Sequence, residues 1–114
     1  MSSELIFDKD FDSEIDEYQE VMLTVKHIKF GNCFNSCVDN LPPNIETIHF
    51  GDFFNQPVDN LPNNIKGLTF GTLFNQSVDF LPGSLQYLEL GEHFNKSLDN
   101  LPNSLKTISF SSSS

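Results

Sequence analysis

Histidine, cysteine and aspartate are the residue types in this chain best suited to catalysis or metal binding. The three histidines are His27, His49 and His93, and none has a Ser or Cys partner at a repeated spacing. Neither H-E-x-x-H nor H-x-E occurs, so these metal-enzyme patterns are missing, and the lack of a Ser or Cys partner gives no indication of an activated nucleophile. We therefore expect no catalytic residues and a protein that is not an enzyme.

The two cysteines, Cys33 and Cys37, lie four residues apart. A structural zinc site needs four ligands, and few candidates for the other two stand nearby. We expect ordinary free thiols, with a disulfide as the alternative, and we expect no metal and no cofactor. Because two cysteines do not make the dense framework of a small secreted domain, a reducing, cytoplasmic location is favoured.

An aspartate recurs every 20 residues, at Asp39, Asp59, Asp79 and Asp99. The simpler interpretation is that each carboxylate accepts backbone N–H groups in its own turn. The alternative is a hard cation such as calcium between neighbouring carboxylates, but the glycine-rich nonapeptide loop of calcium-binding solenoids is not present.

The whole chain from Val25 follows the same 20-residue period. It reads VKHIKFGNCFNSCVDNLPPN, IETIHFGDFFNQPVDNLPNN, IKGLTFGTLFNQSVDFLPGS and LQYLELGEHFNKSLDNLPNS, followed by the half-repeat LKTISF. A fixed period of this length indicates a solenoid of stacked coils.

Each repeat contains one candidate strand. In 45–50 the last four residues alternate polar and apolar, which is typical of a strand with one buried face. The Gly and Pro of the remaining 14 residues leave no room for a crossover helix, so the return segment must be irregular or 3₁₀. We expect a β solenoid with parallel strands near 28–30, 48–50, 68–70, 88–90 and 108–110, and a possible extra strand at 5–7.

Stacked coils place equivalent residues in ladders. The invariant phenylalanines are expected to stack inside, and the invariant asparagines to satisfy backbone groups at the turn and in the neighbouring coil, with ligand contact as the alternative for the asparagines. These structural ladders are Phe34, Phe54, Phe74, Phe94, Asn35, Asn55, Asn75 and Asn95. The invariant glycine after each strand predicts either a positive φ or a close approach between coils.

Residues 1–24 look like a degenerate copy of the repeat. They contain eight acids and one Lys, a charge of −7, out of −10 for the whole chain. We expect 1–24 to be an acidic N-terminal capping repeat, 25–110 to hold four full repeats and a half-repeat, and 111–114 to be a serine tail.

The repeat resembles two related families. The pattern Ile45-x-x-Ile48-x-Phe50 is similar to the core of leucine-rich repeats. The longer unit, Phe54-Asn55-Gln56-Pro57-Val58 followed by Leu61-Pro62 and Phe70-Gly71, resembles the FNIP repeat of slime moulds and giant amoeba viruses. The resemblance implies a protein-interaction repeat without known catalysis, here without room for an F-box, and a host-cytoplasm location if the chain is viral.

The charge of the chain excludes two classes of partner. All six cations are lysines, against 16 acids, so we expect neither nucleic-acid binding nor attraction to an anionic membrane. The apolar runs are also far shorter than the roughly 18 residues of a membrane span, and no secretory leader is expected.

The outward positions of the strands vary where the rest of the repeat is constant. We predict that they bind an unknown protein partner, through His27, Lys29, Thr47, His49, Thr69, Tyr87, Glu89 and Thr107. The alternative is that these positions are only solvated strand residues. The leading hypothesis is a protein–protein interaction scaffold, with Tyr87 as its best anchor.

The alternative is a self-associating structural element. The last strand has no following coil in the sequence to cover it, and an uncovered strand edge is a template for pairing. This predicts a homodimer through an edge formed by Leu105, Thr107, Ile108 and Phe110.

Overall fold

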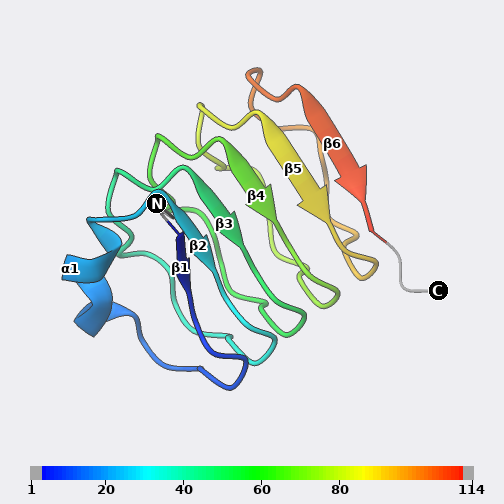
Figure 1. The fold of residues 1–114 in the computed structure, drawn as a ribbon. Coiled ribbons are helices and arrows are strands. Elements are labelled where there is room, and N and C mark those ends of the chain that lie inside the picture. Colours follow the sequence, from blue (N-terminus) through cyan, green and yellow to red (C-terminus); the bar gives the residue numbers. More distant parts are fainter. Residues whose placement is uncertain (1–3, 112–114) are drawn as a thin grey trace.

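The fold is a six-stranded parallel sheet backed by irregular return segments (Figure 1). The computed structural model describes residues 4–111. The strands follow chain order across the sheet: β1 Glu4–Ile6, β2 His27–Lys29, β3 Thr47–His49, β4 Gly67–Thr69, β5 Tyr87–Leu90 and β6 Thr107–Phe110. The predicted β solenoid is confirmed, and the strand expected near 5–7 is present.

The register of the sheet is set by the 20-residue period. Ile28 pairs with Ile48, Ile48 with Leu68, and Leu68 with Leu88. Each of these central residues is almost fully buried, because alternate strand residues point to opposite faces of a sheet. The residues before and after them therefore lie together on the other face.

Within 25–110 the return segments consist of turns and bends, as the sequence indicated. Helical structure lies only in the N-terminal segment among the described residues: a 3₁₀ helix at Asp16–Tyr18 and the four-residue helix α1 at Gln19–Met22. The sequence comparison aligned this segment with a repeat but did not predict α1. Met22 of α1 is fully buried in the core, so the helix contributes to the apolar interior at the N-terminal end of the stack, where Figure 1 shows it. The role of 1–24 as a cap remains a prediction.

Stacked phenylalanine rings form the centre of the core. Phe34, Phe54 and Phe74 are fully buried, and their ring centroids are 5.9 and 6.1 Å apart with nearly parallel planes. A second column, Phe30, Phe50 and Phe70, lies beside the first, at 3.8 to 4.0 Å within each coil. The interior is thus two adjacent aromatic ladders.

Close approach explains the glycine that follows each strand. No glycine among residues 4–111 has a positive φ, so that half of the expectation was wrong. A Cβ built on Gly51 would instead overlap the carbonyl oxygen of Gly31, and Gly71 and Gly91 stand in the same relation to the glycine before them. Neighbouring coils therefore touch backbone to backbone at this corner.

The last coil is less covered than the others. Ile108 is 37% exposed and Phe110 is 57% exposed, whereas Leu88 and Leu90, their equivalents in β5, are fully buried. The apolar side of the coil that contains β6 is consequently open to solvent.

Candidate interaction surface

The outer side of the parallel sheet carries two parallel rows of side chains, which we call the sheet face. One row joins His27, Thr47, Gly67, Tyr87 and Thr107 through the strand register, and the other joins Lys29, His49, Thr69, Glu89 and Ser109. Figure 1 shows the strands side by side along this surface. All eight residues proposed from the sequence therefore lie on one face.

Side chains on the sheet face contact one another across and along strands. A ring nitrogen of His27, Nδ1, lies 2.6 Å from Oγ1 of Thr47 on the next strand. Within β5, the Tyr87 hydroxyl donates to Oε1 of Glu89 at 3.2 Å. These contacts restrict the rotamers of the side chains that a partner would meet.

Two hollows open on the sheet face. The larger, about 220 Å³, lies over Gly67 and is lined by Glu4, Ile28, Thr47, Ile48, His49, Gly67, Thr69 and Tyr87. The second, about 180 Å³, lies toward the ends of the strands, and its polar walls include Asp52, Thr72 and Glu89. His49 and Thr69 border both hollows.

His49 stays neutral more readily than an ordinary histidine. Partial burial of its imidazole against the sheet lowers its pKa below the usual 6.5, and the nearby Lys29 ammonium lowers the pKa further, against the opposing influence of Glu89. At neutral pH the His49 ring that borders both hollows is therefore uncharged.

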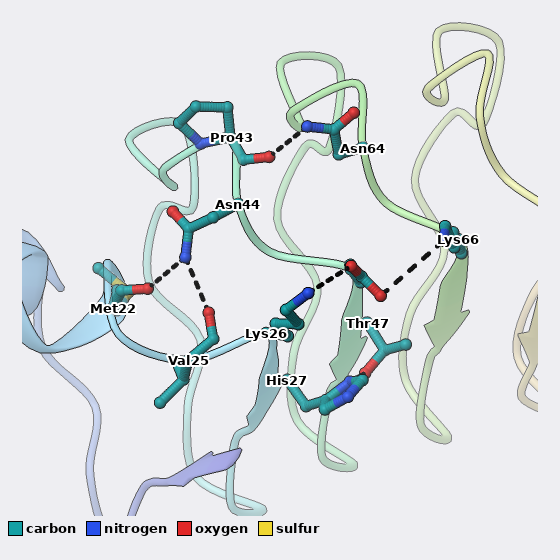
Figure 2. A network of polar contacts seen from close by, with 10 residues as sticks. Met22, Val25, Lys26, His27, Pro43, Asn44, Thr47, Asn64 and Lys66 are labelled. Atoms are coloured by element: carbon teal, nitrogen blue, oxygen red, sulfur yellow. Dashed lines mark hydrogen bonds and ion pairs between the residues drawn. The ribbon is translucent and has the colours of Figure 1, made fainter. Parts of the chain in front are cut away.

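Beside the N-terminal ends of the strands, a carboxylate lies between two lysines. Glu46 is 3.4 Å from the Lys26 ammonium and 4.0 Å from that of Lys66. Nearby, the Asn44 amide donates to the carbonyl oxygens of Met22 and Val25, both at 2.8 Å (Figure 2). The polar side chains beside the N-terminal ends of the strands therefore bind residues of neighbouring coils.

The aspartate turns differ from the expectation. The Asp79 and Asp99 backbone N–H groups donate to the hydroxyls of Ser77 and Ser97, at 3.2 and 3.1 Å. The Asp79 carboxylate accepts instead from the Asn100 amide of the next coil, at 3.3 Å. In these two turns the backbone N–H acceptor is thus the Ser hydroxyl two residues before the Asp, and the Asp79 carboxylate bonds to a side chain instead.

Neither cysteine is in a disulfide, and no group of three potential metal ligands occurs within residues 4–111. A hydrogen bond from the Asp39 N–H lowers the pKa of the Cys37 thiol, but desolvation and the Asp39 carboxylate outweigh it and leave the pKa raised. Cys37 is therefore not activated as a nucleophile.

One exposed apolar feature was not assigned a role from the sequence. Phe53 and Leu73 occupy equivalent positions in adjacent turns and are 51% and 36% exposed. The sequence indicated this feature, because Phe53 stands outside the two columns that hold the buried phenylalanines. These side chains lie on the turns that follow the strands and do not line either hollow.

Comparison with known proteins places the chain in a family. The FNIP Repeat model matches residues 37–73, 54–93 and 74–113. The chain belongs to the FNIP repeat family. These overlapping matches cover each of the coils from β3 to β6, so this FNIP repeat protein carries the family pattern over most of its length.

A longer chain of known structure is similar in part to this FNIP repeat protein, at low sequence identity and in fold alone. It is CroV588, described as a novel circular LRR protein structure, with 22% sequence identity and a TM-score of 0.49. The similarity covers 96% of the present chain but only 31% of CroV588. A search of curated proteins finds no match.

The helices of the structure are short. Within residues 4–111, none has both the length and the apolar composition needed to cross a membrane.

Proposed function

We propose that this FNIP repeat protein is a non-enzymatic, cytoplasmic scaffold that binds a protein partner through the sheet face. The observation that carries the proposal is the set of varied side chains on one regular sheet, above a nearly invariant core. A surface whose positions differ from coil to coil can distinguish partners, whereas the inward positions are held constant by packing.

Tyr87 is the anchor of the proposed surface. It is 40% exposed and its hydroxyl is held by Glu89, so little rotamer freedom would be lost on binding. Aromatic residues of this kind dominate the energetics of many interfaces. The neighbouring hollow over Gly67 gives a partner side chain somewhere to insert.

Affinity capture from host cytoplasm tests this function. Wild type is compared with the double variant Tyr87→Ala/His49→Ala, and the matched control is Phe80→Ala/His93→Ala, which removes an exposed aromatic ring and a histidine away from the sheet face. We expect the first variant to lose partners that the control retains. An identical partner set for all three proteins would contradict the sheet-face proposal.

A second candidate function is self-assembly through β6. The supporting observation is the exposure of Ile108 and Phe110 on the last coil, beside an outer strand edge that pairs with nothing among the described residues. Two copies related by a two-fold axis could pair β6 antiparallel and cover both sets of apolar side chains. The edge would comprise Leu105, Thr107, Ile108 and Phe110.

Light scattering at micromolar concentration tests this candidate. We expect about twice the chain mass for wild type and the monomer mass for Ile108→Lys. Leu73→Lys is the matched control, because Leu73 is 36% exposed and Ile108 is 37% exposed. A wild-type monomer would reject self-assembly and leave the sheet-face proposal intact.

A further inference from the structure

In the sheet-face row of His27, Thr47, Gly67, Tyr87 and Thr107, Gly67 is the one residue that lacks a side chain. The glycines that follow the strands are required by the stack, because a Cβ at Gly51 or Gly71 would overlap the backbone of the preceding coil. A Cβ at Gly67 would meet only Thr47 Cγ2 at 3.5 Å and Tyr87 Cδ2 at 3.6 Å, which are ordinary contacts. Packing therefore does not explain this glycine.

A glycine at position 67 lowers the stability of the fold. A strand-interior glycine loses more backbone entropy than a residue with a side chain, and contributes no cross-strand packing. What it provides is the hollow of about 220 Å³ between Thr47 and Tyr87. This volume is below the roughly 300–1,000 Å³ of small-molecule sites, so the hollow suits a single side chain better than a cofactor.

The walls of the hollow indicate the chemistry of that side chain. Tyr87 presents an aromatic ring held in place by Glu89, and a ring of this kind attracts a cation over its face. Glu4 also lines the hollow, and the chain as a whole carries a charge of −10. Both the local walls and the long-range field favour a cation over an anion.

Among cationic side chains, arginine fits best. Its guanidinium is planar, weakly hydrated and able to stack on an aromatic ring while donating to carboxylates, whereas a lysine ammonium is compact and strongly hydrated. We propose that the hollow over Gly67 binds an arginine side chain of a partner polypeptide, with the guanidinium against the Tyr87 ring. This inference rests on the proposed role of the sheet face and specifies the partner chemistry.

Peptide titration followed by amide and ring NMR shifts tests the inference directly. The probe is acetyl-Gly-Gly-Arg-Gly-Gly-amide, and its matched control replaces Arg by citrulline, which has nearly the same shape but no charge. We expect the arginine peptide to shift Gly67, Tyr87 and His49 selectively, and the citrulline peptide to bind about tenfold more weakly. Equal binding of the two peptides, or shifts spread over the whole acidic surface, would overturn the proposal.

A variant at Gly67 shows whether the arginine peptide binds in the hollow or elsewhere on the sheet face. Gly67→Val places a good strand former in the hollow, so we expect an unchanged or higher melting temperature together with about tenfold weaker arginine-peptide binding. Gly83→Ala is the control, because a Cβ there meets nothing within 4 Å. Undiminished peptide binding by a folded Gly67→Val would overturn the assignment.

The two proposals fail in different ways. If captured partners depend on Tyr87 and His49 but survive Gly67→Val, the sheet face binds its partner and the arginine hollow is wrong. If neither variant changes the captured partners, both proposals are wrong.

Discussion

The carboxamide oxygen of Asn35 accepts the backbone N–H of Asn55 at 2.8 Å, one coil further along the stack. The same bond joins Asn55 to Asn75 and Asn75 to Asn95, each at 2.9 Å. In the first coil the acceptor is Oδ1 of Asp12, 2.8 Å from the N–H of Asn35. A side-chain oxygen thus extends the contact between coils at a turn that the sheet does not reach.

This ladder predicts how substitutions of Asn55 behave. Asn55→Ala removes the acceptor for the Asn75 N–H, and we expect the free energy of unfolding to fall by about 1 kcal/mol in urea denaturation. Asn55→Asp keeps an oxygen in place, as Asp12 does naturally, and should cost clearly less. Equal losses for the two variants would show that the acceptor is not the important feature.

The buried phenylalanine ladder predicts a much larger effect. Phe54→Ala removes a fully buried ring stacked between Phe34 and Phe74, and we expect a loss of roughly 3–5 kcal/mol in the same measurement. Phe53→Ala is the control, since the adjacent ring is 51% exposed and should cost well under about 1 kcal/mol. Similar losses for both would contradict the assignment of inside and outside.

Glycine substitutions should show whether a glycine is needed for close backbone contact between coils or only for its own backbone flexibility. Gly51→Ala forces a methyl group against the Gly31 carbonyl, so circular dichroism should show a melting transition lowered by several degrees, or a protein that does not fold. Gly83→Ala has open space for its methyl group and is expected to melt close to wild type. A Gly51→Ala protein as stable as wild type would be inconsistent with backbone contact between coils.

The pH dependence of His49 has a defined sign. Its pKa in the folded chain lies below the usual 6.5, so the folded protein binds fewer protons than the unfolded chain when the pH falls below about 6.5. The contribution of His49 to stability is therefore complete above this pH and is lost as the pH falls through the folded pKa. An imidazole NMR titration should give a midpoint below 6.5, and Lys29→Met should raise it; a midpoint above 6.5 would refute the assignment.

Removal of residues 1–24 tests whether the N-terminal segment is a cap. It would strip β1 from the edge of β2 and uncover Phe30, against which Phe7 stacks at 5.0 Å. We expect aggregation, detected by size-exclusion chromatography. A monomeric truncated protein of undiminished stability would show that the segment is dispensable.

The 20-residue repeat made the fold predictable from the sequence. Features that depend on short local segments or on side-chain orientation were not predictable. Alternation in 45–50 located β3 because Ile48 and Phe50 are buried while the residue between them and the residue directly before them are not. The helix α1 was not foreseen, since four residues are too few to show a helical period. The sheet-face rows followed from the period, but the hollow over Gly67 depends on the orientation of Tyr87, which no spacing in the sequence specifies.

The constant register also bears on how such a chain can change in length. Every coil from β2 to β6 offers the next one the same hydrogen-bonding edge at the same offset. Duplicating a 20-residue stretch such as 45–64 would therefore insert one further coil without disturbing the pairing on either side, whereas inserting a single residue into a strand would reverse its faces. Whole-unit gene duplication is thus the mutational route that this architecture tolerates, and each duplication would add one new position to each row for selection to modify.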